Sequence, residues 1–379
     1  MKFIIEKREL SSITSMVHRA ASTKNTIPVL SGLLIEVSNE KGLVMTATDM
    51  EIGIKASTKN VEIIKEGTVL VNAHYFSDFI KLLPDSQIQI ELNQDKAKLN
   101  ISYGRSSGFI NIYSDYEYPD LPLEKLEYKI SVPQKVLREA FRKTSFAAAM
   151  THFRQVFTGV LFDLKEDGIL RIVASDTHRL AHYTFKTESK NTSAISFIVP
   201  TRSINELMRI IDDNDDLIDI SFSENNIIFS NPDFILLSRI IDGQYPNYEQ
   251  VIPKSSSSVL LINAKVLSNT LERAKIMPTD DKTKIQHVQF IFSENEAKVE
   301  SFSEIMGEIQ EVIEDLAIEG EKDFKIAFNT NYFLDIVKIL NDECEQIRIE
   351  LSGSLGPVKI VNPAAGNYLY VLVPLRTSN

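Results

Sequence analysis

The sequence predicts an α+β protein of three similar domains, each built from two copies of a helix-plus-strands unit. Three observations lead to this fold class. One helical pattern occurs six times, segments with strand periodicity separate the copies, and the six units fall into three pairs. Self-similarity at a nearly fixed spacing indicates one supersecondary unit used repeatedly. The function must therefore be one that a repeat architecture can perform.

The helical pattern consists of an apolar strand end followed by an amphipathic segment. Its copies begin 61 to 67 residues apart and cover 5–17, 71–83, 132–144, 199–211, 262–274 and 328–340. The sixth position is always apolar, and apolar residues usually recur three or four places later, which predicts one buried helix face. Asn72, Asn263 and Asn329 suit an N-cap, whereas Pro133 and Pro200 suit the first helical turn.

The segments between the helices alternate apolar and polar residues and predict β-hairpins. Short hairpins are expected at 86–102, 216–230 and 346–361, where the loops carry Asn, Gly or Ser. Longer hairpins of related form follow the first, third and fifth helices, at 30–54, 157–181 and 287–309. Each unit is therefore read as strand, helix and three strands.

The pairing of the units divides the chain into three predicted domains. Two of the pairs end in segments rich in turn formers and aromatic residues, 115–122 and 242–253. We place the domains at 1–125, 126–253 and 254–379, each of a usual size for one hydrophobic core.

Composition and charge narrow the class of protein. The chain has one cysteine, no apolar run that could span a bilayer and no apolar leader, so a reducing cytoplasmic location is expected. The net charge is −11, yet the six helical windows together carry +9, which leaves −20 for the rest. Helices placed side by side would form a basic face that a polyanion feels locally. The alternative is that exposed helix faces carry Lys and Arg only for solubility.

Known catalytic and metal-binding motifs are missing from the sequence. There is no phosphate-binding Gly-rich loop, no H-E-x-x-H motif and no Cys/His set spaced for zinc, and we expect no cofactor. The segment ASDTHRLAH (174–182) could place Asp176 beside His178 as a general base. The equivalent segment ATDMEIGI (47–54) repeats the Asp as Asp49 but not the His and Arg. We therefore interpret the Asp as a turn residue, and His178, Arg179 and Leu180 as a site that occurs once.

These motifs carry a family resemblance. The chain resembles the bacterial replicative sliding clamp, the β subunit of DNA polymerase III. The matching stretches are TIPVLSGLLIEV (26–37), TATDMEIGI (46–54), ASDTHRLA (174–181), DGQYPNYEQVIP (242–253) and YVLVPLR (370–376).

The resemblance implies a DNA-clamp fold with helices inside and curved antiparallel sheets outside. Two chains would join head to tail as a homodimer, a ring around double-stranded DNA that acts as a processivity factor without its own catalytic site. The implied partners are DNA of any sequence, DNA polymerase subunits, the clamp loader and other clamp-binding replication and repair proteins, with no membrane involved. Contacts to phosphates would be weak and sequence-independent.

Positive charge and position on the helices select the DNA-lining candidates. Lys24 also falls where the resemblance places a DNA-contacting residue. The candidates are Lys7, Arg8, Arg19, Lys24, Lys135, Arg138, Arg142, Lys143, Arg202, Arg209, Lys265, Arg273 and Lys275. For each, the alternative is an ordinary solvated surface charge.

The resemblance also implies a groove for a mostly hydrophobic partner peptide with polar or acidic ends. Its residues would be Phe157, Ser175, Thr177, His178, Arg179, Leu180, Pro246, Val251, Leu355, Pro357, Val371, Leu372, Val373, Pro374, Leu375 and Arg376. Three features depart from the family pattern: Thr177 replaces a common glycine, Phe157 an aliphatic residue, and Gln250 an arginine of some members. The segment 276–288 does not align cleanly and is expected to be a longer loop.

The resemblance also implies a subunit interface, and the residues at its positions are Phe109, Ile276 and Met277. The alternative is that these side chains are buried inside their own domains. Two other classes of function stay open at this point. One is an enzyme that uses Asp176 and His178, and the other is a monomeric protein-binding repeat scaffold.

Overall fold

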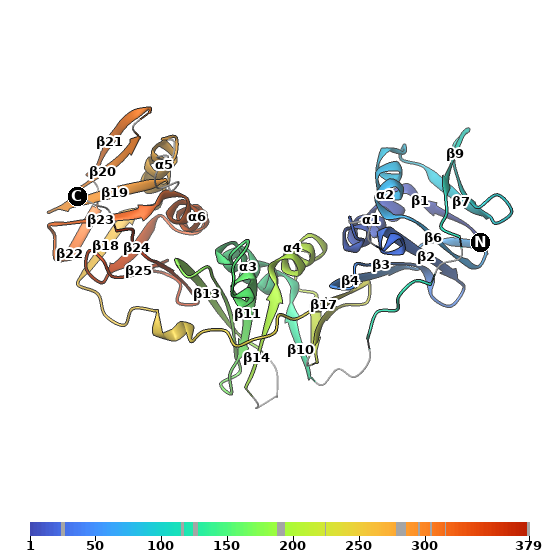
Figure 1. Cartoon of the computed structure of the whole chain (residues 1–379), viewed down its shortest axis with the longest axis horizontal. Coiled ribbons are helices and arrows are strands. Elements are labelled where there is room, and N and C mark those ends of the chain that lie inside the picture. Colours follow the sequence, from blue (N-terminus) through green and yellow to red (C-terminus); the bar gives the residue numbers. More distant parts are fainter. Residues whose placement is uncertain are drawn as a thin grey trace. The chain divides into compact units, whose positions relative to one another are not determined.

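The computed structural model describes residues 1–23, 27–114, 117–123, 128–187, 194–223, 225–277, 286–294, 296–303, 305–314 and 316–376. Lys24, the predicted boundary at 125/126 and most of the segment 276–288 lie outside these residues. Within them the chain folds into six α-helices and four antiparallel sheets (Figure 1). The predicted α+β class is confirmed.

The six repeated helices form where the pattern predicts them. They are α1 (Lys7–Val17), α2 (Ala73–Leu82), α3 (Gln134–Thr144), α4 (Thr201–Ile210), α5 (Ala264–Ala274) and α6 (Thr330–Asn341). No helix in the described ranges is long and apolar enough to cross a membrane.

Contacts along the chain define two compact units. Unit 1 comprises Met1–Arg138, Thr187–Ser189 and Arg202–Ile240, and unit 2 comprises Glu139–Lys186, Lys190–Thr201 and Ile241–Asn379. The division passes through α3.

Unit 1 contains two sheets. The order of the five-stranded sheet is β5 (Glu62–Lys65), β1 (Lys2–Glu6), β7 (Gln87–Asn93), β8 (Lys98–Tyr103) and β9 (Ser106–Asn111). The order of the eight-stranded sheet is β10 (Tyr128–Pro133), β15 (Leu217–Phe222), β16 (Asn226–Ser230), β17 (Phe234–Arg239), β4 (Ile52–Thr58), β3 (Gly42–Thr48), β2 (Gly32–Ser38) and β6 (Gly67–Asn72).

Unit 2 also contains two sheets. The order of the nine-stranded sheet is β14 (Ile195–Pro200), β11 (Gly159–Leu164), β12 (Ile169–Ser175), β13 (Arg179–Lys186), β26 (Tyr368–Leu372), β25 (Val358–Val361), β24 (Gln346–Leu351), β18 (Ser258–Asn263) and β22 (Leu316–Gly320). The order of the four-stranded sheet is β21 (Gly307–Ile313), β20 (Glu296–Ser303), β19 (His287–Ser293) and β23 (Phe324–Asn329).

The middle third of the sequence contributes strands to both units. Its strand β17 pairs with β4 of the first third, and its strand β13 pairs with β26 of the last third. The strand pairs therefore join neighbouring thirds of the sequence into two continuous sheets, and the two compact units do not coincide with the sequence repeats. The three-domain division at 125/126 and 253/254 stays a prediction.

The helices bury the apolar face that their periodicity predicts. In unit 1, α1 packs on α2 and on strands β3 and β4, and in unit 2, α5 packs on α6 (Figure 1). The sixth residue of the pattern is fully buried at Leu10, Phe76 and Leu137. Burial of such side chains between sheet and helix supplies most of the stability of a fold of this kind.

The predicted helix caps are confirmed for the three asparagines. Asn72 accepts a hydrogen bond from Tyr75 N at 3.0 Å, Asn263 one from Val266 N at 3.0 Å, and Asn329 one from Asn331 N at 3.0 Å. These bonds satisfy backbone N–H groups that have no partner within the first helical turn.

The prediction for the two prolines was wrong by one position. Pro133 and Pro200 end strands β10 and β14, and the helices begin at the next residue. Both strands lie at the edge of their sheet. An edge strand tolerates a residue without an N–H, because one side of it makes no ladder bonds.

Candidate functional site

Unit 2 contains a groove of about 720 Å³. Ten of the residues predicted to line it do so: Phe157, Ser175, Thr177, Arg179, Leu180, Pro246, Val251, Pro357, Val371 and Val373. They come from the middle and the last thirds of the sequence, which meet where β13 pairs with β26. The groove is therefore a product of that strand pairing.

The other six predicted groove residues do not line it. They are His178, Leu355, Leu372, Pro374, Leu375 and Arg376. Leu372 was a wrong prediction because side chains alternate along a strand: Val371 and Val373 line the groove, while Leu372 is fully buried. Pro374 is buried as well, and the backbone of Leu375 pairs with Ala327 of β23. His178 and Leu355 are exposed outside the groove.

Sequence reasoning missed one wall of the groove. The missed residues are Arg154, Tyr245, Asn247, Tyr248, Gln250, Ile252, Pro253, Lys254, Ser255 and Ser352. Most belong to one segment that follows β17, and its cluster of turn formers and aromatic residues was the available signal. Of that segment, Pro246 and Val251 were predicted to line the groove, and Gln250 was named only as a departure from the family pattern.

The floor of the groove is apolar and firmly packed. Phe157, Leu180 and Val371 belong to one buried cluster with residues of β11 and β12, and Tyr245 packs against it. The charges at the groove are basic, because Arg154, Arg179 and Lys254 line it and no Asp or Glu does among the described residues. The site thus suits an apolar ligand that carries negative charge.

A tight turn between β12 and β13 forms another wall. Asp176 Oδ1 accepts hydrogen bonds from the backbone N–H groups of His178 and Arg179, both at 3.0 Å. Asp49 Oδ1 makes the same two bonds with Glu51 and Ile52, at 3.1 and 3.0 Å. The prediction that the repeated Asp is a turn residue is confirmed.

Thr177 has a left-handed backbone in this turn. Its φ is +78°, and Met50 in the equivalent turn has a φ of +76°. Glycine adopts this conformation without the steric cost that a β-branched residue carries. A glycine at position 177 would relieve this strain, yet the turn forms with a threonine there.

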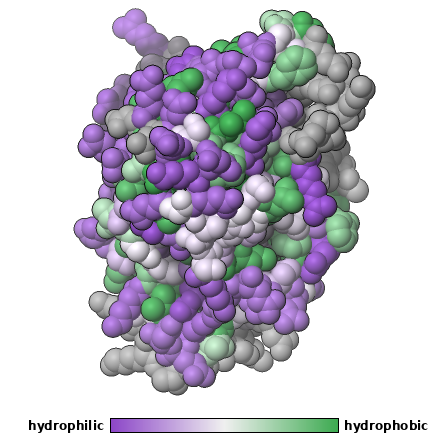
Figure 2. All heavy atoms as spheres, turned by 90° about the vertical axis from the view of Figure 1, so that its left-hand side faces the viewer, coloured by the Kyte–Doolittle hydropathy of each residue, from purple (hydrophilic) through white to green (hydrophobic). Residues whose placement is uncertain are grey.

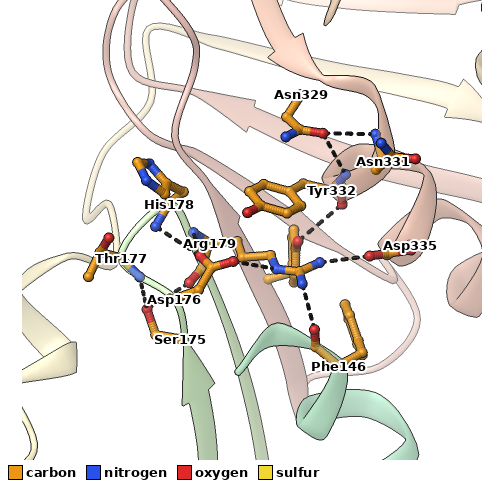
Figure 3. Close-up of polar contacts among 11 residues, drawn as sticks. Phe146, Ser175, Asp176, Thr177, His178, Arg179, Asn329, Asn331, Tyr332 and Asp335 are labelled. Carbon is orange, nitrogen blue, oxygen red and sulfur yellow. Dashed lines mark hydrogen bonds and ion pairs between the residues drawn. The ribbon is translucent and has the colours of Figure 1, made fainter. Parts of the chain in front are cut away.

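The Arg179 guanidinium is held by the protein and is not a free charge at the groove (Figure 3). Its side chain is 9% exposed, and its guanidinium donates to Asp176 Oδ2 at 3.0 Å, to Asp335 Oδ2 at 2.7 Å and to the Phe146 carbonyl at 2.6 Å. Arg154 and Lys254 are the cations at the groove that form no ion pair within the described part of the chain.

The enzyme interpretation loses its proposed acid–base pair. The Asp176 oxygens bind the backbone of the turn and the Arg179 guanidinium, so they do not orient the His178 ring. Among the described residues, no group of His, Cys, Asp and Glu could hold a metal ion.

Lys143 is a correction to the DNA-lining set. Its side chain is 4% exposed, and its ammonium contacts Glu139 at 2.7 Å and Glu343 at 2.8 Å. The rings of Tyr183 and Tyr368 cover it. The positive charge of α3 had suggested a solvated lysine. Instead, the Lys143 side chain is buried and links α3 to Glu343, which follows α6.

Arg138 is also engaged by the protein. Its guanidinium donates to the carbonyls of Met208 and Ile211, at 2.6 and 2.8 Å, and so caps the C-terminal end of α4. Such a contact stabilises a helix end and holds this guanidinium against the protein.

Most of the remaining candidates are exposed but paired with a carboxylate. These are Arg8, Arg19, Lys135, Arg142, Arg202, Arg209 and Arg273. Lys7, Lys265 and Lys275 form no ion pair among the described residues. An exposed pair contributes little to stability, so a phosphate can replace the carboxylate at small cost.

The predicted interface residues are not all buried in their own domains. Phe109 on the edge strand β9 is 54% exposed, Ile276 is 71% exposed, and Met277 is half-buried. Sequence reasoning missed further exposed apolar residues near the edge strand β21: Phe302, Ile305, Met306 and Val312. On the face shown in Figure 2, hydrophilic side chains predominate and hydrophobic ones are scattered.

Comparison with protein families covers nearly the whole chain. Residues 1–122, 131–247 and 249–376 match the N-terminal, central and C-terminal domain models of the DNA polymerase III beta subunit.

Individual relatives match end to end. The chain is 31% identical over 387 residues to the beta sliding clamp of Halalkalibacterium halodurans and 30% identical over 384 residues to that of Bacillus subtilis, with both chains fully covered. The crystal structure of the Bacillus subtilis DNA polymerase sliding clamp matches with a TM-score of 0.91 and 29% identity over all of both chains. A Pseudomonas aeruginosa sliding clamp bound to griselimycin matches with a TM-score of 0.90 and 26% identity, again over all of both chains.

The buried Lys143 gives a prediction about stability. Replacing Lys143 with Ala removes the cation that Glu139 and Glu343 share and leaves Glu343 with Arg142 alone, which should lower the free energy of unfolding by about 2 kcal/mol. Urea unfolding followed by circular dichroism measures this loss. The control is Lys135→Ala, which removes an exposed ion pair and should cost far less. Equal losses of unfolding free energy in the two variants would contradict the burial of the Lys143 side chain.

His182 gives a prediction about pH. Burial and the nearby Arg171 lower the pKa of His182 from its ordinary value of 6.5 to about 4. The unfolded chain therefore binds the proton first, and the free energy of unfolding should fall as the pH drops from 6.5 towards 4. In His182→Asn the slope should be smaller by up to about 1.4 kcal/mol per pH unit. Identical slopes in urea titrations of both proteins would contradict the burial of this ring.

Proposed function

This chain belongs to the DNA polymerase III β subunit family and is a sliding clamp of DNA replication, and we propose that two copies close head to tail around duplex DNA. The ring tethers the replicative polymerase to its template and so makes synthesis processive. The observation that carries the proposal is the end-to-end similarity to sliding clamps in both sequence and structure.

The basic helix residues are the proposed contacts to DNA. Lys265 and Lys275 lie exposed at the two ends of α5, and Lys7 begins α1. These lysines meet phosphates directly, whereas the paired arginines exchange a carboxylate for a phosphate. Contacts of this kind read no bases and weaken steeply with salt, which suits a protein that must move along DNA. Retention comes from the closed ring.

The edge strands β9 and β21 are the proposed ring interface. β9 ends the five-stranded sheet of unit 1 and β21 ends the four-stranded sheet of unit 2, so each offers unpaired backbone groups. Phe109 on β9 and Val312 on β21 are both 54% exposed. Lys98 and Arg105 lie near the first edge and Glu308 lies on β21, so the two edges carry opposite charges. β9 of one chain would continue the sheet at β21 of the next.

The groove of unit 2 is the proposed docking site for the polymerase, the clamp loader and other replication and repair proteins. It combines an apolar floor with the unpaired cations Arg154 and Lys254. This arrangement favours short apolar peptides with acidic flanks. The clamp has no catalytic site or cofactor in this proposal and works in the cytoplasm.

Retention on DNA tests the proposal against the alternative of a monomeric repeat scaffold. Clamp loaded on circular DNA with the cognate loader and ATP should stay bound, and it should be lost when a restriction enzyme cuts the circle. Equal retention on circular and linear DNA would favour the scaffold.

The variant Lys265→Glu with Lys275→Glu tests the proposed DNA contacts. It should weaken direct DNA association and reduce the slope of log K against log salt by about 2. An unchanged slope would exclude both lysines from the lining.

Ring closure predicts a change of oligomeric state. Ile276→Asp combined with Phe109→Asp should convert a dimer into a monomer in sedimentation velocity, because both substitutions bury a charge in the proposed interface. The matched control is Phe153→Asp, since Phe153 is 89% exposed and belongs to neither β9 nor β21. A dimer that survives the double substitution would place the interface elsewhere.

A further inference from the structure

One guanidinium joins three separate segments behind the groove. Arg179 begins β13, Asp335 lies in α6, and Phe146 lies in the short 3₁₀-helix Ser145–Ala147 that follows α3. Figure 3 shows the Arg179 side chain between them, with the Tyr332 ring beside it. The guanidinium carbon lies 4.1 Å from the centre of that ring and 5.6 Å from the centre of the Phe146 ring.

Two of these segments lead directly into walls of the groove. Arg179 follows the turn whose residues Ser175 and Thr177 line one wall. The segment anchored at Phe146 runs on to Arg154 and Phe157, which form a second wall, and Ala149 N bonds the Phe157 carbonyl at 2.8 Å.

The third wall is β26, which continues into Val373. Its residue Tyr370 donates to the Tyr332 carbonyl at 3.1 Å, and its ring stacks on Phe146. Leu372 of β26 pairs with Arg179 in the sheet, and Val373 N bonds the His178 carbonyl at 2.9 Å. The three walls are thus all connected to one residue, Arg179.

We propose that Arg179 is a positioning residue for the partner groove, and that it makes partner binding depend on Asp335, a residue outside the groove. The proposal rests on the groove being the partner site. Arg179 acts from behind: it fixes the spacing of the three walls, so the apolar partner meets a preformed surface and loses less conformational freedom on binding.

The competing role is direct contact between the guanidinium and a partner. Each of the three guanidinium nitrogens already donates to the protein, and only 9% of the side chain is exposed. A partner carboxylate would therefore have to displace Asp176 or Asp335. Arg154 and Lys254 offer the same charge without that displacement.

The planar fork of arginine is essential to this arrangement. It reaches three acceptors in different directions while it stacks on an aromatic ring, whereas a lysine ammonium is a single point charge. Lysine at position 179 keeps the charge beside Asp176 but cannot hold Asp335 and the Phe146 carbonyl together. Arg179→Lys therefore separates positioning from charge.

The experiment compares single and double variants of the full chain. The probe is the purified replicative polymerase of the same bacterium, and the measurement is its Kd for the clamp by surface plasmon resonance. Asp335→Ala should weaken binding at least about fivefold, the lower end of usual coupling between separate sites. Arg179→Lys should weaken it at least as much, and the double variant should be no worse than Arg179→Lys alone. Asp335→Glu should restore most of the affinity.

The matched control is Lys338→Ala, which breaks the exposed ion pair between Lys338 of α6 and Glu272 at 2.9 Å. It should leave the Kd unchanged, and the melting temperature of each variant shows whether a change in Kd only follows lost stability. Wild-type affinity in Asp335→Ala, or fully additive losses in the double variant, would overturn the positioning role. Val373→Asp, inside the groove, tests the proposed function separately: if it leaves binding intact, the groove itself is not the partner site.

Discussion

Antiparallel pairing between strands far apart in the sequence is the constraint on which this structure depends. The middle third of the chain does not close its own sheets. Its strands β15–β17 continue into β4, and its strands β11–β14 continue into β26. The first and middle thirds of the sequence therefore share one sheet, and the middle and last thirds share another. The groove exists because β13 and β26 lie side by side, which brings Leu180 opposite Val371.

The positive charge of the helices also depends on neighbouring side chains. The chain is acidic overall, and its basic helix residues are mostly held by nearby carboxylates. These exposed pairs limit the attraction to a polyanion without abolishing it, because each pair is weak in water. A protein that must hold DNA loosely benefits from cations whose charge is only partly available. The buried Lys143 differs from them, since its two carboxylates and two aromatic rings leave no access to a phosphate.

Local pattern was sufficient to predict the helices, their asparagine caps and the turn at Asp176, because each depends on residues close in sequence. It was not sufficient for Lys143 and Arg138. Both were chosen from the charge of a helix face, but their orientation depends on Glu343 and on the end of α4, which come from distant segments. The groove was predicted in part for the same reason. Strand alternation explains why Val371 and Val373 were right and Leu372 was wrong, while the wall at Tyr245 required the path of the chain after β17.

The proposed pairing of the edge strands β9 and β21 has a consequence for assembly. β9 and β21 are different surfaces of one chain, so an interface between them is heterologous and each new copy exposes a fresh edge at its far end. Nothing in the pairing itself limits the count to two, because only the angle between successive copies decides whether the series closes. A substitution that changes this angle slightly, without weakening the interface, would therefore turn a closed assembly into an open filament. In the proposed assembly, a closed ring and an open filament are alternative products of the same contact.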